Sequence, residues 1–156
     1  MNFIGVVGAR KFNDRKAVED LVAGLPKDSI IVTSGCKGVC TWARAKAEEK
    51  SLEVIVYTPD LSNIHCRFEI PKRYYQRNSE LIEKCDFVHA FISKAGGYSG
   101  GTRFEIEYAV KTRIPVKVHW EGKMDEIIYQ NQLPFKREKQ FYSAAWQNFF
   151  CEAVTF

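Results

Sequence analysis

Short apolar runs alternate with longer charged or alanine-rich segments along most of this chain, and this alternation constrains the fold more than any other feature. The runs cover residues 3–8, 29–33, 53–58, 86–92 and 115–120. A short run that is apolar throughout is typical of a strand covered on both faces, because an exposed face would carry polar residues at every second position. The sequence therefore predicts the strands of a buried, parallel sheet.

The segments between these runs predict helices. Asp14 suits the N-cap of a helix over residues 15–25, which Gly24 and Pro26 would end. We also expect helices over residues 39–50, 77–85 and 102–112, with residues 59–73 irregular. Strands that alternate with helices form βαβ units. The predicted fold class is α/β, a mostly parallel sheet of about five or more strands flanked by helices on both faces.

A length of 156 residues suits one domain, so we expect a single domain over residues 1–156. The C-terminal extension, about residues 121–156, has weaker periodicity and ends in the aromatic-rich stretch FYSAAWQNFFCEAVTF. We expect it either to pack a last helix on the sheet or to form a subunit interface, because aromatic faces are covered in one of these two ways. A homo-oligomer, a dimer or higher, is the expected assembly.

The net charge of +4 is compatible with an anionic small ligand, but it is too mild to predict nucleic acid as a partner. No apolar run reaches the roughly 18 residues of a membrane span, and the first residues lack the features of a secretion signal. We therefore expect no membrane contact and a cytoplasmic location, which would be the host cytoplasm for a phage-encoded chain.

The five cysteines are expected to be reduced thiols in that compartment. Cys36, Cys40, His65 and Cys66 fit no zinc-binding spacing, so neither a metal nor a cofactor is expected. Buried or partly buried thiols are the preferred interpretation of these residues.

Three loops that each follow a strand carry glycine or basic residues: GARKFND, SGCKG and SKAGGYSGGT. The carboxyl ends of parallel strands meet at one edge of a sheet, where ligands bind in folds of this class. We expect a pocket there, and the candidate ligand-binding residues are Gly8, Ala9, Arg10, Ser34, Gly35, Lys37, Arg77, Asn78, Gly96, Gly97, Ser99, Gly100, Gly101, Thr102 and Glu105.

The glycine loop leads directly into a predicted helix, so its free N–H groups and the helix dipole favour a phosphate. Glycines would let such an anion approach the backbone closely. Thr102 and Glu105, three residues apart, share one face of the first helical turn. They place either a carboxylate beside the ligand or a capping box at the start of the helix. Glu107 is expected to face solvent.

The basic and amide candidates have two interpretations each. Arg10 pairs with a phosphate or is a surface arginine, and Lys37 contacts a phosphate or lies in solvent. Asn78 belongs to the site or is the N-cap of the helix that follows, with Arg77 as its solvated neighbour. The segment KRYYQR, residues 72–77, stacks nucleic-acid bases or supplies tyrosines that flank a nucleotide pocket.

Four segments in order resemble the SLOG superfamily: GVVGARKF, VTSGCKGVCTWARAKAEE, RNSELIEKCDFVHAFI and GGYSGGTRFEIEYAVKTRIPV. This superfamily holds the Lonely-Guy (LOG) phosphoribohydrolases, the DNA-processing A (Smf) proteins and small YspA-like proteins. The similarity covers about residues 3–118, and the YspA-like branch is the nearest in pattern. The resemblance implies a Rossmann-like fold that binds nucleotides or molecules derived from them.

Gly96, Gly97, Gly101, Thr102 and Glu105 correspond to the LOG pattern Pro-Gly-Gly-x-Gly-Thr-x-x-Glu, with Ala95 in place of proline and two extra loop residues. The resemblance implies that Glu105 would be catalytic in an enzyme of this type, with Arg77 as a loose counterpart of the second catalytic residue. Glu105 also resembles the glutamate in the Gly-Thr-x-x-Glu segment of nucleoside 2'-deoxyribosyltransferases. Cys40 stands where the Smf and YspA-like groups have aspartate, and a thiol does not replace a carboxylate acceptor.

Three hypotheses follow. The first is a module that binds and senses or sequesters a nucleotide or a nucleotide-derived signal, without turnover. The second is an N-glycoside hydrolase that acts on a nucleoside monophosphate through Glu105. The third is single-stranded DNA binding, which the mild net charge places last.

Overall fold

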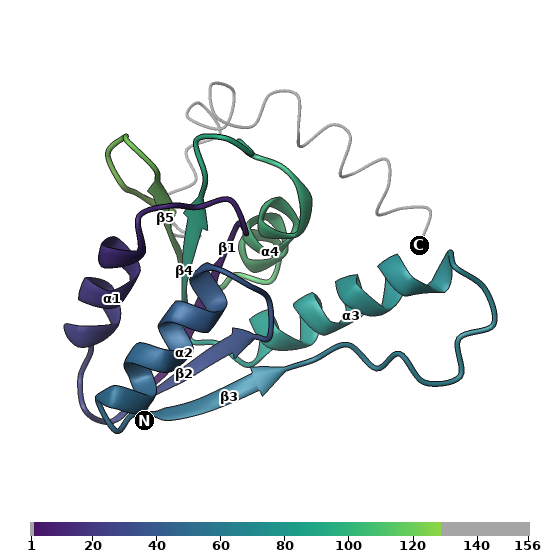
Figure 1. Cartoon of the computed structure of the whole chain (residues 1–156), viewed down its shortest axis with the longest axis horizontal. Helices are drawn as coiled ribbons and strands as arrows, with labels where there is room; N and C mark the ends of the chain where they lie inside the picture. The colour runs from purple at the N-terminus through teal and green to yellow at the C-terminus, as the bar shows by residue number, and fades with distance from the viewer. Residues whose placement is uncertain (1, 129–156) are drawn as a thin grey trace.

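The strands form one six-stranded sheet in the order β3-β2-β1-β4-β5-β6 (Figure 1). A computed structural model describes residues 2–128. The strands are β1 (Asn2–Gly8), β2 (Ser29–Ser34), β3 (Glu53–Tyr57), β4 (Phe87–Ile92), β5 (Val116–Trp120) and β6 (Glu126–Ile128). The first five pair in parallel, and β6 pairs antiparallel with β5 at one edge. The predicted α/β, Rossmann-like class is confirmed.

The helices are α1 (Arg15–Ala23), α2 (Val39–Glu49), α3 (Glu69–Glu83) and α4 (Gly100–Lys111). Helix α1 packs beside α2 on one face of the sheet, and α3 packs beside α4 on the other (Figure 1). Side chains from successive strand residues point to opposite faces. Val6 therefore lies in the core under α1 and α2, whereas Val7 lies in the core under α3 and α4.

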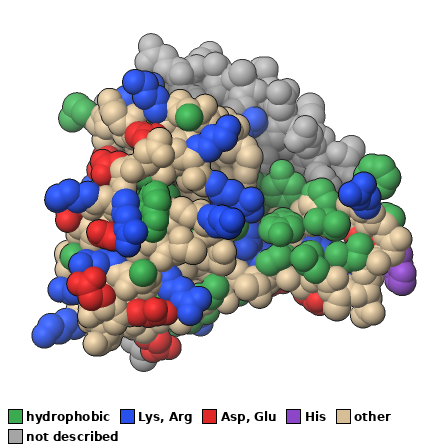
Figure 2. Space-filling model, in the orientation of Figure 1, with side chains coloured by type: hydrophobic (Ala, Val, Ile, Leu, Met, Phe, Trp, Pro, Cys, Tyr) green, Lys and Arg blue, Asp and Glu red, His purple; other side chains and the backbone are tan. Residues whose placement is uncertain are grey.

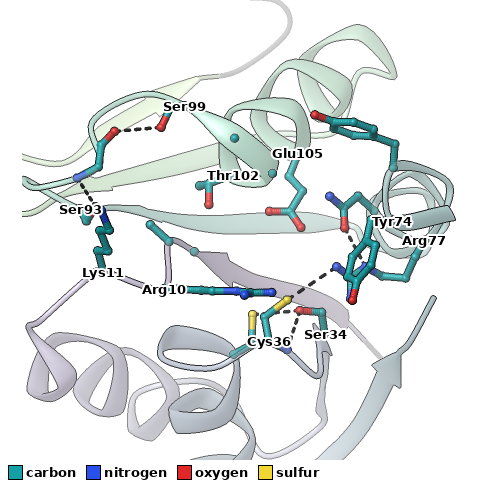
Figure 3. A pocket seen from close by; sticks show the side chains of 18 of the residues that line it. Arg10, Lys11, Ser34, Cys36, Tyr74, Arg77, Ser93, Ser99, Thr102 and Glu105 are labelled. Carbon is teal, nitrogen blue, oxygen red and sulfur yellow. Dashed lines mark hydrogen bonds between the residues drawn. The ribbon is translucent and has the colours of Figure 1, made fainter. Parts of the chain in front are cut away.

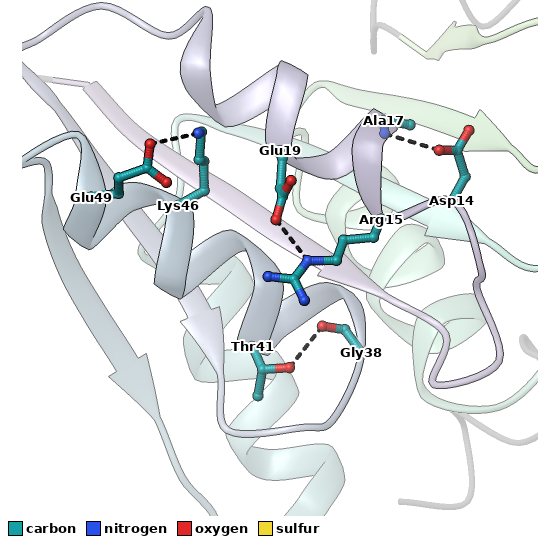
Figure 4. Close-up of polar contacts among 8 residues, drawn as sticks. All are labelled: Asp14, Arg15, Ala17, Glu19, Gly38, Thr41, Lys46 and Glu49. Carbon is teal, nitrogen blue, oxygen red and sulfur yellow. Dashed lines mark hydrogen bonds and ion pairs between the residues drawn. The ribbon is translucent and has the colours of Figure 1, made fainter.

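Local side-chain contacts fix the ends and outer faces of α1 and α2 (Figure 4). The Asp14 side chain caps α1 by accepting a hydrogen bond from the Ala17 N–H at 3.1 Å, as the sequence predicts. The ion pairs Arg15–Glu19 and Lys46–Glu49, at 2.7 and 2.8 Å, lie on the solvent side. Exposed helical pairs of this kind contribute little to stability, so the buried core dominates it.

Helix α3 begins at Glu69, well before the predicted start at residue 77, and extends into the segment expected to be irregular. The proline at position 71 explains the difference. It lies in the first turn of α3, where a backbone N–H has no partner within the helix and proline is tolerated. The longer helix brings residues 70–78 to the carboxyl edge of the sheet.

The strand β6 is a second difference, because the sequence predicts no strand after residue 120. The segment has only three residues, too few for a periodic signal, and its pairing with β5 determines its structure. The expected packing or interface role of the aromatic-rich tail concerns residues 129–156, which lie outside the described residues. Among residues 2–128, no helix has the length and apolar character needed to cross a membrane.

Candidate functional site

A cavity of about 660 Å³ opens at the carboxyl ends of the parallel strands, beside the point where β1 and β4 are neighbours (Figure 3). The chain leaves β1 toward α1 on one face and leaves β4 toward α4 on the other. The two loops therefore diverge and leave space between them, which is the usual ligand position in open α/β sheets. The volume lies within the range of about 300–1,000 Å³ that is typical of small-molecule sites.

Most of the residues that the sequence singles out line this cavity, and they come from three loops and two helices. They are Gly8, Ala9, Arg10, Ser34, Arg77, Asn78, Gly96, Ser99, Gly100, Gly101, Thr102 and Glu105. Gly35, Lys37 and Gly97 are candidates that do not line it. Tyr74 and Tyr75 of the KRYYQR segment line the cavity as well. It also includes residues that are not among the candidates from the sequence: Lys11, Cys36, Cys40, Ile70, Pro71, Ser93 and Ala95.

The glycine loop between β4 and α4 is held by its own hydrogen bonds. The Ser93 hydroxyl accepts from the Gly96 N–H at 2.9 Å, and the Ser99 hydroxyl donates to the Gly96 carbonyl at 2.8 Å. Gly97 and Gly100 both have φ of +62°, a conformation that favours glycine. At these two positions glycine is explained by the turn of the backbone, and not by the close approach of an anion.

Helix α4 begins at this loop, with Ser99 as its N-cap residue and no side-chain capping bond. Thr102 and Glu105 lie inside the helix, so the capping-box interpretation of this pair is wrong. The Ser99 side chain instead donates a hydrogen bond to the Gly96 carbonyl, so it does not cap α4. The first N–H groups of α4 lie beside the cavity without a bond to this side chain. This end of the helix carries the positive part of the helix dipole.

Glu105 points from α4 into the cavity (Figure 3). The residue is only 6% exposed, and its carboxyl oxygens are open to the cavity. Burial raises the pKa of Glu105 to about 8, and the nearby Arg77 opposes this only in part. At neutral pH the carboxyl is therefore mostly protonated and able to donate a hydrogen bond.

Arg77 and Asn78 lie in the middle of α3, so the interpretation of Asn78 as an N-cap is wrong. Both are buried, with Arg77 at 5% exposure. The Arg77 Nε donates to Asn78 Oδ1 at 2.7 Å, and its Nη1 and Nη2 contact the Tyr57 carbonyl and the Cys36 sulfur at 3.4 and 3.7 Å. The guanidinium is thus fixed in place at the cavity wall.

Arg10 and Lys11 are exposed basic residues at the end of β1, on the opposite side of the cavity from Glu105 (Figure 3). Arg10 extends toward Cys36, with which its side chain hydrogen-bonds. With Arg77, three cationic side chains reach one cavity. This local concentration of positive charge cannot be read from a net charge of +4.

Aromatic residues of α3 line the mouth of the cavity. Tyr74 lies under the Arg77 guanidinium, 5.4 Å from it, and Tyr75 is 42% exposed with its ring 4.7 Å from that of Phe104. Figure 2 shows hydrophobic side chains gathered over α3, where Phe68 and Ile70 are exposed as well. The position of the tyrosines agrees with either interpretation of the KRYYQR segment, since they flank a pocket and also offer ring faces for stacking.

Glu107 is buried at 1% exposure, so the expectation that it faces solvent is wrong. Its Oε1 accepts from Arg103 Nε at 2.9 Å and from the Tyr98 hydroxyl at 3.2 Å. Because Tyr98 belongs to the glycine loop, this contact ties the loop to α4.

Among residues 2–128, no three His, Cys, Asp or Glu side chains are arranged to hold a metal ion.

Comparison with known proteins finds similarity at the level of structure. No protein-family model matches the sequence, and no curated protein matches it either. DNA processing protein A from Streptococcus pneumoniae superposes with a TM-score of 0.58 at 17% identity, over 76% of this chain and 50% of that one. This chain thus corresponds to half the length of the pneumococcal protein. DNA processing protein A from Helicobacter pylori, whose structure concerns its single-stranded DNA binding mode, superposes with a TM-score of 0.59 at 18% identity. That alignment covers 99% of this chain and 80% of the other.

These neighbours contradict the expectation that nucleic acid is not a partner for a chain of this kind, because a protein with the same fold binds single-stranded DNA. The expectation failed because it used the net charge, whereas Arg10, Lys11 and Arg77 gather at one cavity. The comparisons and the order of the strands in the sheet therefore indicate the same fold. The chain has the fold of DNA processing protein A, with a polar cavity at the topological switch point.

Proposed function

We propose that this chain binds single-stranded DNA by taking one nucleotide unit into the cavity between the β1 and β4 loops. The observation that carries the proposal is Glu105, a residue at 6% exposure whose carboxyl faces the cavity. A carboxyl in this position can hydrogen-bond to a ligand that enters the cavity, which makes it a specific contact for part of a nucleotide.

The phosphate of that nucleotide lies between the end of β1 and the start of α4. Arg10 and Lys11 supply positive charge from one side, and the first N–H groups of α4 supply hydrogen-bond donors from the other. Two cationic side chains and a helix N-terminus form a suitable environment for a phosphodiester. The affinity should therefore fall as the salt concentration rises.

The base or sugar lies beside Glu105. Since the pKa of Glu105 is about 8, its carboxyl is neutral at pH 7 and does not repel an anionic ligand. A protonated carboxyl donates one hydrogen bond and accepts another, which suits a base edge that presents a carbonyl next to an N–H. Ionisation above pH 8 would remove the donor and add repulsion, so binding should weaken at high pH.

The flanking nucleotides leave the cavity over α3. Tyr75 lines the cavity and forms a tilted aromatic pair with Phe104 of α4, and Phe68, immediately before the first residue of α3, is 85% exposed. Stacking of a base on an aromatic ring contributes about 1–3 kcal/mol and does not depend on sequence. A strand, in contrast to a free nucleotide, would use this surface, and the fold shared with a DNA-binding protein favours the strand.

The test is a fluorescence anisotropy titration of labelled oligothymidylate with the purified protein at several salt concentrations. We expect saturable binding of the oligothymidylate, and duplex DNA should be only a weak competitor. Arg10→Gln should lower the affinity about fivefold or more and reduce the salt slope by about 1. Arg44→Gln is the matched control, because it removes the same charge from an exposed position on α2, away from the cavity.

Free nucleotides serve as competitors in the same assay. If the proposal holds, a mononucleotide competes with the oligonucleotide only at much higher concentration, since it lacks the contacts over α3. A nucleotide that binds tightly while the oligonucleotide does not would contradict the DNA proposal and favour a module that senses or sequesters a free nucleotide. Absence of binding by either would contradict the assignment of the cavity itself.

A second candidate function is hydrolysis of the base–ribose bond of a nucleoside monophosphate, and the protonation of Glu105 is the observation that favours it. A carboxyl with a pKa of about 8 is a proton donor at pH 7, so Glu105 can protonate the leaving base while water adds to the sugar carbon. Free base and ribose phosphate should then appear in proportion to protein concentration and disappear with Glu105→Gln. Intact nucleotides after prolonged incubation would exclude this activity.

A further inference from the structure

Two cysteines line the cavity and share one hydrogen-bonding partner. The Ser34 hydroxyl donates to the Cys40 sulfur at 3.2 Å and accepts from the Cys36 N–H at 3.3 Å. The Cys36 thiol also hydrogen-bonds to the Ser34 side chain. Both sulfur atoms therefore lie next to the same oxygen (Figure 3), although Cys36 is in the β2–α2 loop and Cys40 is in the first turn of α2.

The two thiols have opposite surroundings. Cys36 is only partly buried, and although burial raises its pKa, hydrogen bonds with Ser34 and Arg77, the Arg77 charge and a hydrogen bond with Arg10 together hold the pKa below the ordinary value. Cys40 is fully buried, and burial, with a smaller contribution from the Glu105 charge, raises the pKa of its thiol. One thiol is thus accessible and activated, and the other is protected and protonated.

We propose that Cys36 and Cys40 are a redox-active thiol pair that reduces a low-molecular-weight disulfide and closes into a reversible Cys36–Cys40 disulfide at the cavity wall. Cys36 is the attacking residue, because it is the accessible sulfur and contacts the fixed Arg77 guanidinium at 3.7 Å. Cys40 is the resolving residue, because its sulfur and that of Cys36 both contact the Ser34 side chain.

The reaction has two exchange steps. The Cys36 thiolate attacks one sulfur of the small disulfide, so that a mixed disulfide forms and the other half leaves as a thiolate. Cys40 then loses its proton to solvent and attacks the Cys36 sulfur, which forms the intramolecular bond and releases the second half as a thiolate. The two protein thiols are oxidised, and one small disulfide is reduced to two thiols.

Closure also changes the cavity. A Cys36–Cys40 bond removes the thiol that Arg77 and Arg10 contact, and it fixes the loop that includes Gly38, whose backbone has φ of +85°. The redox chemistry does not require that the cavity binds DNA, so the two proposals are tested independently. A change of ligand affinity on oxidation would be a consequence and not the test.

The test uses the reduced full chain, oxidised glutathione as the probe, and mass spectrometry of the intact protein and its peptides over time. We expect a transient glutathione adduct on Cys36, followed by a product that has lost two hydrogen atoms and links Cys36 to Cys40. The exposed Cys66 is an internal reference for an ordinary surface thiol. At pH 7, Cys36 should react at least about threefold faster than Cys66.

The wild-type experiment is decisive without any variant. Reaction of Cys36 no faster than Cys66, or a mixed disulfide on Cys36 that Cys40 does not resolve, would overturn the proposal. Lowering the pH from 8 to 6 should slow the reaction of Cys36 with glutathione less than the reaction of Cys66.

This pH dependence reflects the charged and titratable groups that face Cys36. They are Arg10 from the β1 loop, Arg77 from α3, Cys40 from α2 and Glu105 from α4.

Variants identify the role of each group. Cys40→Ala should trap the glutathione adduct on Cys36, and Cys36→Ser should leave Cys40 unmodified. Arg77→Gln should slow the attack by Cys36 severalfold, since it removes a charge that stabilises the thiolate. Lys72→Gln is the matched control, because it removes an exposed charge from the same helix, outside the cavity. Equal rates in these two variants would contradict the role of Arg77.

Discussion

Glu105 lowers the stability of the empty protein as the pH rises. Its pKa is raised from 4.5 to about 8 by burial, so between these values the folded chain keeps a proton that the unfolded chain has lost. The free energy of unfolding therefore falls through this window, by up to about 1.4 kcal/mol per pH unit. Such a cost is expected of a residue that is kept for binding and not for folding.

Replacement of Glu105 by glutamine should remove this pH dependence. We expect Glu105→Gln to have nearly wild-type stability at pH 4.5 and to become progressively more stable than wild type toward pH 8, while its affinity for oligothymidylate falls. Urea denaturation at a series of pH values measures the difference. Glu48→Gln is the control, because Glu48 lies in an exposed ion pair with Arg44. A difference that is constant with pH would contradict the raised pKa of Glu105.

At the scale of elements, β4 and β5 carry a histidine pair, the buried His89 and the partly buried His119, on the face that α1 and α2 cover. His89 Nδ1 and His119 Nε2 lie 3.0 Å apart, and His119 stacks on Phe91. Burial, followed by the positive charges of His119 and Lys117, lowers the pKa of His89 from 6.5 to about 3. His89 is therefore neutral at pH 7 and hydrogen-bonded in the core, as its position in a buried strand predicts.

The histidine pair should make the fold sensitive to acid. Between pH 6.5 and about 3 the unfolded chain binds a proton at His89 that the folded chain does not, so stability falls as the pH is lowered through this window. His89→Phe should lose less stability than wild type between pH 6.5 and 4, by up to about 1.4 kcal/mol per unit. His65→Gln, an exposed substitution, should follow the wild type. Parallel curves for His89→Phe and wild type would contradict this account.

Helix α3 illustrates what local sequence rules miss. The sequence predicts a helix only over residues 77–85 and an irregular segment over residues 59–73, whereas α3 begins at Glu69. Packing of α3 against α4 and the sheet stabilises the additional turns. These turns carry Tyr74 and Tyr75, which line the cavity beside Arg77 and Asn78.

For the whole molecule, the alternation of apolar runs was enough to predict the sheet, and the strand-end rule was enough to predict which loops meet. What the sequence could not supply is the arrangement of side chains within the cavity. The position of the Glu105 carboxyl in the cavity, the contact of Arg77 with Cys36 and the shared hydroxyl of Ser34 depend on distances between elements far apart in the chain. The net charge does not show where charged side chains lie, so it was a poor guide to the proposed DNA partner.

The most direct test of the account is an NMR titration of the isotope-labelled full chain with a short oligothymidylate, in which the backbone amide shifts locate the ligand. We expect the largest shifts at residues 8–11 and 96–105, with smaller ones along α3 near Tyr75. The amides of α1 and of the β5–β6 hairpin should move little. Large shifts confined to those control regions, or none at saturating DNA, would contradict the proposal that the cavity at the β1–β4 switch point is the binding site.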